Sequence, residues 1–306
     1  MGIEVLVVGS LHFDIVVHSE RLPRIGETFP GRDWMTKCGG KGGNQAIAAA
    51  RHGASTAIVA SVGNDRFGTL LLDNLTLSRV DSRFVQRSEI GSGMSVAMSD
   101  AAGDYGAVIV TGSNAQLGDE AILAAANELS QTGVLVLQNE LPEQANLVAA
   151  RAAQARGAQV ILNAAPARAM SSELLTLVDV LIVNAVEAEM LGGGVVSDLL
   201  SAERAAETLA ILVPVVIVTA GGHGLAFHSA MGSHTLGAYS VALVNSHGAG
   251  DAFVGALAAK LAQAMTLEEA TVYANAAAAV LVSTQEAKRQ LLSSHDTENL
   301  LRRMTQ

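Results

Sequence analysis

The chain has 306 residues, of which 50% are hydrophobic and 16% charged, so it has enough apolar material for a large buried core. Its net charge of −10 and its 3% of aromatic residues argue against a nucleic-acid-binding protein, which needs basic surface and stacking platforms. A single cysteine, Cys38, excludes an intrachain disulfide, and the longest apolar stretch, residues 211–220, is too short to span a membrane, so we expect a soluble, cytoplasmic protein.

Short apolar runs, rich in β-branched residues, recur along the chain and predict buried parallel strands at residues 5–8, 57–60, 134–137, 160–162, 181–183 and 215–218. Helical patterns lie between and after them, from near Asn44 to Gly53, from Pro142 to Gly157, and over residues 173–177, 202–212, 250–264 and 267–282. Residues 286–306 have a polar helical pattern typical of a peripheral element. This alternation predicts a mostly parallel sheet with helices on both faces, a three-layer α/β sandwich.

Two segments, residues 13–37 and 93–111, interrupt the alternation and resemble strands joined by turns. In the second segment, residues 95–98 and 107–110 flank a turn at residues 102–104. We expect these segments to form a small accessory β-sheet, a candidate lid. Because no long linker separates independent units, residues 1–306 are expected to form a single domain.

The most informative stretch is residues 245–251, in which Gly248, Ala249 and Gly250 open a helix that carries Asp251 in its first turn. Unpaired N–H groups at a helix start favour an anion, and a carboxylate beside them can accept a proton. This combination suggests phosphoryl transfer to a hydroxyl group. The alternative is an ordinary helix start, in which Asp251 only complements the helix dipole.

A second glycine-rich stretch covers residues 39–46. It is not a P-loop, because position 35 is methionine where that motif needs glycine, and glycine rather than Ser or Thr follows Lys41. The late stretch also fails as a dinucleotide fingerprint, because Phe253 stands where the third small residue belongs.

Three motifs, at residues 39–44, 184–187 and 248–251, resemble those of the ribokinase/PfkB carbohydrate-kinase family in their order and spacing. Supporting segments at residues 9–14, 139–140, 163–168 and 219–224 extend the resemblance over essentially the whole chain, and within the family the ribokinases are the most similar. The resemblance implies an ATP-dependent, Mg²⁺-requiring kinase that phosphorylates a primary hydroxyl of a pentose or similar small sugar. It also implies a homodimer that forms through the β-sheet lids.

The resemblance further implies roles for individual residues. Asp251 would be the general base, and the N–H groups of Gly248, Ala249 and Gly250 would form an anion hole for the transferring phosphoryl group. The substrate-binding residues would be His12, Asp14, Gly40, Lys41, Asn44, Glu140 and Asp251. The nucleotide-binding residues would be Asn184, Thr219, Gly221, Gly224 and Asn275. Glu187, with Asn184, would hold Mg²⁺ through water.

Several of these residues also have a purely structural interpretation. Asp14 could serve only a turn after the first strand, and His12 could pack the lid. Gly224 could be an ordinary turn glycine, and Glu187 an exposed helix residue.

The sequence departs from the family pattern at three places. Asn245 and Ser246 replace the usual Asp-Thr, whose aspartate helps to bind a monovalent cation, so the loss of charge argues against K⁺ activation. The segment at residues 283–288 lacks its usual glycine, and Lys288 offers a side-chain cation instead. His12 stands where ribokinases commonly have asparagine, so the substrate need not be D-ribose.

Three other functions compete with a pentose kinase. One is a family kinase for a nucleoside, fructose or a keto-sugar acid. Another is a non-catalytic sugar- or nucleotide-binding regulator that keeps the fold. A nicotinamide dehydrogenase has only the α/β pattern in its favour, and a fold alone does not establish function.

Overall fold

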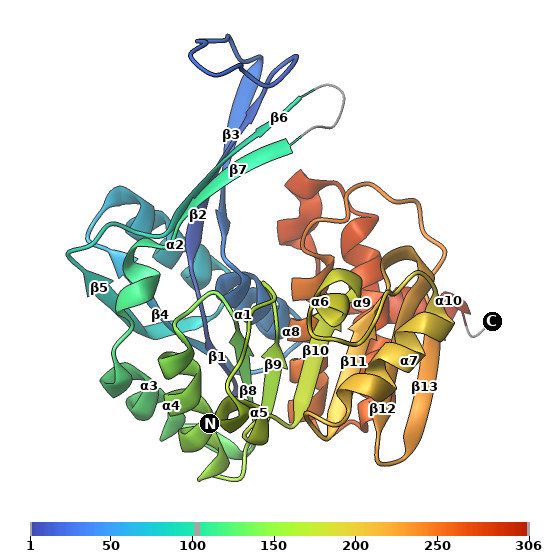
Figure 1. Ribbon diagram of the computed structural model, residues 1–306. Helices are drawn as coiled ribbons and strands as arrows, with labels where there is room; N and C mark the ends of the chain where they lie inside the picture. Colours follow the sequence, from blue (N-terminus) through green and yellow to red (C-terminus); the bar gives the residue numbers. More distant parts are fainter. Residues whose placement is uncertain (1, 101–104, 305–306) are drawn as a thin grey trace.

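The computed structural model describes residues 2–100 and 105–304, which form two β-sheets and the helices that surround the larger one (Figure 1). The larger sheet has the strand order β13-β12-β11-β10-β9-β8-β1-β4-β5. Its strands are β1 (Ile3–Val8), β4 (Thr56–Gly63), β5 (Asp81–Ser88), β8 (Leu129–Gln138), β9 (Gln159–Asn163), β10 (Val180–Asn184), β11 (Val215–Thr219), β12 (Gly224–Ser229) and β13 (Gly232–Gly237). Seven neighbouring strands run parallel, and β12 and β13 continue the sheet in antiparallel pairing. The predicted α/β class is therefore confirmed.

Helices cover both faces of this sheet. They are α1 (Lys41–Arg51), α2 (Arg66–Leu77), α3 (Asp119–Ala126), α4 (Glu143–Gln154), α5 (Ser172–Thr176), α6 (Ala185–Met190), α7 (Leu199–Leu209), α8 (Ala249–Ala262), α9 (Leu267–Val282) and α10 (Ser294–Met304), with short 3₁₀ turns η1 (Gly112–Gln116), η2 (Gly221–His223) and η3 (Glu286–Leu291). Side chains alternate along β1, so that Leu6 and Val8 enter the core under α3 to α7, while Val5 and Val7 enter the core under α1, α2, α8 and α9. Both faces are buried, which explains why the strands consist of uninterrupted apolar residues.

The six predicted strand segments all lie within observed strands, and the predicted helix over residues 267–282 coincides with α9. The prediction that the first helix begins near Asn44 is wrong, because α1 begins at Lys41 and includes Gly42 and Gly43. A Cβ atom on Gly42 would lie 2.5 Å from the backbone of Gly9, so glycine is needed where α1 crosses the end of β1. The polar C-terminal segment divides into η3 and α10.

The smaller sheet has the order β3-β2-β6-β7 and projects from the body of the molecule (Figure 1). Its strands are β2 (His12–His18), β3 (Asp33–Gly39), β6 (Met94–Ser99) and β7 (Tyr105–Val110). Strand alternation places Asp14, Lys37 and Ser95 on one face, and Trp34 and Val108 on the other. The turn predicted at residues 102–104 lies outside the described residues.

Within residues 2–100 and 105–304, we find no helix both long and apolar enough to cross a membrane.

Candidate active site

The predicted site residues gather at the carboxyl edge of the large sheet, where ligands of open α/β sheets usually bind. Glu140 follows β8. Asn184 ends β10 and Thr219 ends β11, and these two residues are paired across the neighbouring strands. A cavity of about 750 Å³ opens beside this edge, between α1, the start of α8, the small sheet and the C-terminal segment. Its lining includes Asp14, Lys37, Asn44, Gly248 and Asp251.

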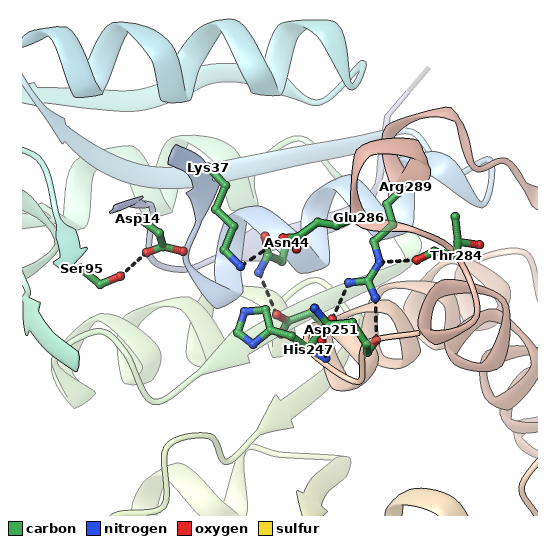
Figure 2. A network of polar contacts seen from close by, with 10 residues as sticks. Asp14, Lys37, Asn44, Ser95, His247, Asp251, Thr284, Glu286 and Arg289 are labelled. Atoms are coloured by element: carbon green, nitrogen blue, oxygen red, sulfur yellow. Dashed lines mark hydrogen bonds and ion pairs between the residues drawn. The ribbon is translucent and has the colours of Figure 1, made fainter. Parts of the chain in front are cut away.

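Asp251 lies in the first turn of α8 and is held by two side-chain amides. Asn44 Nδ2 donates to its Oδ2 and Gln45 Nε2 donates to its Oδ1, each at 2.9 Å (Figure 2 shows the Asn44 contact). Burial raises the pKa of Asp251, while the nearby charge of Lys41 and the two amides oppose this rise. Two fixed hydrogen bonds orient the carboxylate and leave further lone pairs on both oxygens for a ligand hydroxyl.

Buried amides that the sequence analysis missed support this carboxylate. Gln45 Nε2 also donates to Asn163 Oδ1 at 3.0 Å, and Gln45 Oε1 accepts from Gln138 Nε2 at 2.8 Å. The chain of amides therefore connects Asp251 to the ends of β8 and β9. Gln45 follows Asn44 within the glycine-rich motif, but nothing in the sequence indicates that it contacts residues 118 positions away.

The start of α8 provides the candidate anion site. Gly248 has a left-handed conformation (φ 84°) and caps the helix. The N–H of Ala249 donates to Ser246 O at 3.2 Å, whereas the N–H groups of Gly248 and Gly250 make no hydrogen bond to the described residues. A Cβ built on Gly250 meets no atom within 4 Å, so open space lies in front of this helix turn.

The predicted sugar-binding residues come from the small sheet and the start of α1. Asp14 accepts a hydrogen bond from Ser95 Oγ at 2.6 Å, and a Cβ on Gly39 would lie 2.2 Å from Asp14 Oδ2. Figure 2 shows Asp14, Lys37, Asn44 and Asp251 around the same space.

Glu140 and Gly40 lie at the start of α1. Gly40, at φ 89°, caps the helix, and the backbone N–H of Lys41 donates to Glu140 Oε2 at 2.8 Å. Ser10 Oγ donates to the same oxygen. One oxygen of Glu140 therefore caps the helix that carries Asn44 and Gln45, a role that the sequence did not indicate.

His12 begins β2 on the same face as Asp14 and is 6% exposed. Its Nε2 is buried without a hydrogen-bond partner among the described residues. The neighbouring backbone is fixed by Asn114, whose amide accepts from Leu11 N–H at 2.9 Å and donates to Leu11 O at 2.8 Å. His12 is thus held at the base of the small sheet.

Asn184 and Glu187 form a capping box at the start of α6. The N–H of Glu187 donates to Asn184 Oδ1 at 2.8 Å, and the N–H of Asn184 donates to Glu187 Oε2 at 2.9 Å. Glu187 is only 8% exposed, so its interpretation as an exposed helix residue is wrong. Burial raises the pKa of Glu187, whereas the bond from Asn184 and the charge of Lys41 lower it.

The remaining predicted nucleotide-binding residues lie around the ends of β11 and β13. Thr219 Oγ1 donates to Val183 O at 3.4 Å, and Asn275 Nδ2 on α9 donates to Gly237 O at 2.9 Å. Gly221 and Gly224 have φ of 55° and 113°. A Cβ on Gly224 would lie 2.0 Å from Leu236 O, so this glycine is required for strand packing whatever else it does.

The loop at residues 245–247, where the sequence resemblance places a monovalent-cation site, is contacted by an arginine side chain. Asn245 Oδ1 accepts from the N–H of His247 at 2.9 Å. Lys288 is exposed, and the side chain that contacts the 245–247 loop is Arg289, so the choice of Lys288 as the cation is wrong.

Comparison with known proteins agrees with this geometry. The model for "pfkB family carbohydrate kinase" matches residues 3–293. A ribokinase of Mus musculus is 37% identical over 286 residues, covering 91% of this chain and 88% of its own. A deoxyribokinase of Salmonella typhi is 30% identical over 270 residues, covering 87% of this chain and 88% of its own.

Among solved structures, a ribokinase of Arabidopsis thaliana in complex with ribose and ATP superposes with a TM-score of 0.88 at 28% identity, over 98% of this chain and 99% of that one. The motifs that carry the sequence resemblance, the two sheets and the match over nearly the whole length lead to one conclusion: the chain belongs to the pfkB family of carbohydrate kinases.

Proposed function

We propose that this protein is an ATP-dependent kinase that transfers the γ-phosphate of ATP to a primary hydroxyl of a pentose. The observation that carries this proposal is the placement of Asp251, oriented by Asn44 and Gln45 beside the open N-terminus of α8. A carboxylate able to accept a proton and N–H groups able to receive an anion thus lie within one helix turn.

In the proposed reaction, Asp251 accepts the proton of the sugar hydroxyl while the hydroxyl oxygen forms a bond to the γ-phosphorus. The bond from that phosphorus to the bridging oxygen breaks, and ADP leaves with the electron pair. The N–H groups of Gly248 and Gly250 stabilise the charge on the transferring group, and the Lys41 side chain adds positive charge nearby.

The residues present are compatible with Mg²⁺ as the counterion of ATP. Glu187 places a buried carboxylate near the charges of Lys41 and Asp251, and its capping bond engages one of its two oxygens. The described residues contain no group of three or more His, Cys, Asp or Glu side chains suited to a metal. Glu187 would therefore hold a hydrated ion through water, as Mg²⁺ prefers, and the ion would neutralise phosphate charge.

For the acceptor, we propose that Asp14, Gly40, Lys41, Asn44 and Glu140 bind the sugar hydroxyls, with His12 adjusting which hydroxyls are accepted. Support for a pentose comes from the relatives, which are a ribokinase and a deoxyribokinase.

Residues 13–37 and 93–111 would act as a lid on the single domain. Asn184, Thr219, Gly221, Gly224 and Asn275 would contact the nucleotide. The single cysteine is in keeping with a cytoplasmic enzyme.

We also propose that the protein is a homodimer. The face of the small sheet opposite Asp14 exposes Trp34 at 70% and Val108 at 69%, together with Val96, Met98 and Val110. Apolar side chains in one contiguous face are typical of an interface, and a second copy would cover them.

The decisive experiment measures ADP release from MgATP over ribose, 2-deoxyribose, other pentoses, fructose, a keto-sugar acid and nucleosides. Asp251→Asn should lower kcat by roughly 10²- to 10⁴-fold on the preferred acceptor while sugar binding, measured by calorimetry, persists. Because burial raises the pKa of Asp251, the wild-type kcat/KM should fall with decreasing pH from a point above the ordinary aspartate value.

Asp119→Asn is the matched control, since Asp119 is an exposed carboxylate in the first turn of α3. Undiminished turnover by Asp251→Asn would overturn the role of this residue. Binding of sugar and ATP without turnover on any acceptor would favour a binding-only regulator.

A further inference from the structure

The side chain of Arg289 is surrounded by backbone carbonyl oxygens from two separate segments. Its Nη2 donates to Asn245 O at 2.6 Å, its Nη1 to His247 O at 2.7 Å, and its Nε to Thr284 O at 3.2 Å (Figure 2). All three nitrogens of the guanidinium group are therefore engaged by carbonyl oxygens. The group is half-buried between the loop that precedes α8 and the turn that follows α9.

Converging backbone carbonyl oxygens are also the ligands with which proteins hold monovalent cations. Here these oxygens already accept from a cation that is part of the chain. The side-chain oxygen of Asn245 is occupied as well, by the N–H of His247. The residues present thus do not fit the K⁺ site that the sequence resemblance implies, because the positive charge of Arg289 already lies among the oxygens near residue 245 and would repel a second cation.

The contact with His247 O bears directly on the anion site. In a trans peptide the C=O and N–H groups point in opposite directions, and the carbonyl of His247 shares its peptide unit with the N–H of Gly248. Arg289 holds the oxygen end of this unit, so it fixes the opposite, N–H end pointing away from the guanidinium group. A charged donor on the carbonyl also polarises the unit and strengthens its N–H as a donor.

Arg289 remains charged although burial lowers its pKa, because an arginine side chain does not lose its proton in proteins. Glu286 lies close enough to oppose that pKa shift, but it forms its ion pair with Lys37 at 3.4 Å. The guanidinium group therefore supplies a permanent positive charge at the loop that leads into α8.

We propose that Arg289 is a positioning residue which orients and polarises the His247–Gly248 peptide for the transferring phosphoryl group, so that this kinase works without a monovalent cation. The inference rests on the proposed kinase function and extends it to the ion requirement. It assigns to one side chain both the charge and the geometry that a bound cation would otherwise provide.

The first test compares wild-type turnover on the preferred sugar in potassium, sodium and tetramethylammonium buffers of equal ionic strength. Equal kcat in all three is expected. A clear stimulation by potassium would overturn the inference while leaving the kinase function intact, whereas silence on every acceptor would instead refute the proposed function.

The second test uses Arg289→Ala and Arg289→Lys. We expect Arg289→Ala to lower kcat by roughly tenfold to a hundredfold, on the scale of losing one anion-hole donor, with little change in KM for the sugar. Added guanidinium or potassium ion should restore part of that loss. Arg289→Lys should be intermediate, because an ammonium group cannot reach three carbonyls in one plane.

Arg204→Ala is the control, since Arg204 is exposed on α7 and lies outside the site. Thermal melting and calorimetric sugar binding will show whether Arg289→Ala is folded. A folded variant that binds sugar and keeps wild-type kcat, or that loses kcat without any response to added cations, would overturn the assignment. Should the variant fail to fold, the wild-type ion comparison still decides.

Discussion

At the scale of single residues, two glycines near the site illustrate opposite reasons for lacking a side chain. Gly224 has φ 113° and leaves no space for a side chain, because a Cβ would lie 2.0 Å from Leu236 O. Gly250 has an ordinary helical conformation, and a Cβ there meets nothing within 4 Å. Gly224 is therefore required by packing, whereas the space at Gly250 is available to a ligand.

We expect Gly250→Ala to melt near the wild-type temperature but to lose kcat, because its methyl group would enter the space proposed for the phosphoryl group. Gly224→Ala should instead lower the melting temperature, because a left-handed residue with a close backbone contact is strained by any Cβ. Thermal melting and ADP-release assays on both variants check this. A fully active Gly250→Ala would contradict the proposed position of the phosphoryl group.

At the scale of elements, α1, α8 and α9 meet around a buried histidine. His52 follows α1, is 5% exposed, and contacts Tyr273 OH of α9 through Nδ1 at 3.1 Å. Lys260 of α8 lies over the Tyr273 ring at 4.4 Å. Burial, with the charges of Arg51 and Lys260, lowers the pKa of His52 to about 3.

This shift makes stability depend on pH. The unfolded chain binds a proton at His52 below about pH 6.5 and the folded chain does not, so the free energy of unfolding falls as pH decreases. His52 should contribute a loss of about 2 kcal/mol between pH 7 and pH 5. Urea unfolding at both pH values should show a smaller loss for His52→Gln. His295→Gln, at an exposed position on α10, should behave like the wild type, and equal losses in all three proteins would contradict the prediction.

The elements also show which parts of the structure the sequence could predict. Strands of the large sheet are buried on both faces, so apolar runs such as residues 5–8 identify them without knowledge of the fold. Strand β5 lies at the edge, is only half-buried and contains Arg83 and Gln86, so it carries no such signal. The start of α1 was missed because Gly42 serves packing within a helix, where local propensity favours a loop.

The same limit applies to the site. Motif residues such as Asn44 and Asp251 were identified by the resemblance, but their contact depends on a pairing 207 positions apart. The supporting amides Gln138 and Asn163 end strands whose apolar pattern says nothing of hydrogen bonding. Lys288 and Arg289 are adjacent cations, and only the direction of each side chain from η3 decides which of them reaches the carbonyls.

At the scale of the whole molecule, the apolar face of the small sheet determines the proposed assembly. Val108→Asp would place a charge on that face, so we expect the variant to sediment as a monomer and the wild type as a dimer. Ile211→Asp is the control, because Ile211 is 87% exposed but lies after α7, away from the small sheet. A wild-type protein that sediments as a monomer at all concentrations would contradict the dimer.

The ion pair between Lys37 and Glu286 has a consequence for the proposed lid. It joins β3 of the small sheet to η3, at 3.4 Å, with the two side chains 27% and 39% exposed. A pair so long and so accessible to water contributes little, about 0–1 kcal/mol, and salt screens it. The contact between the small sheet and η3, the short segment that carries Arg289, is therefore weak. Movement of the proposed lid away from η3 would break this weak ion pair and leave the three carbonyl hydrogen bonds of Arg289 intact.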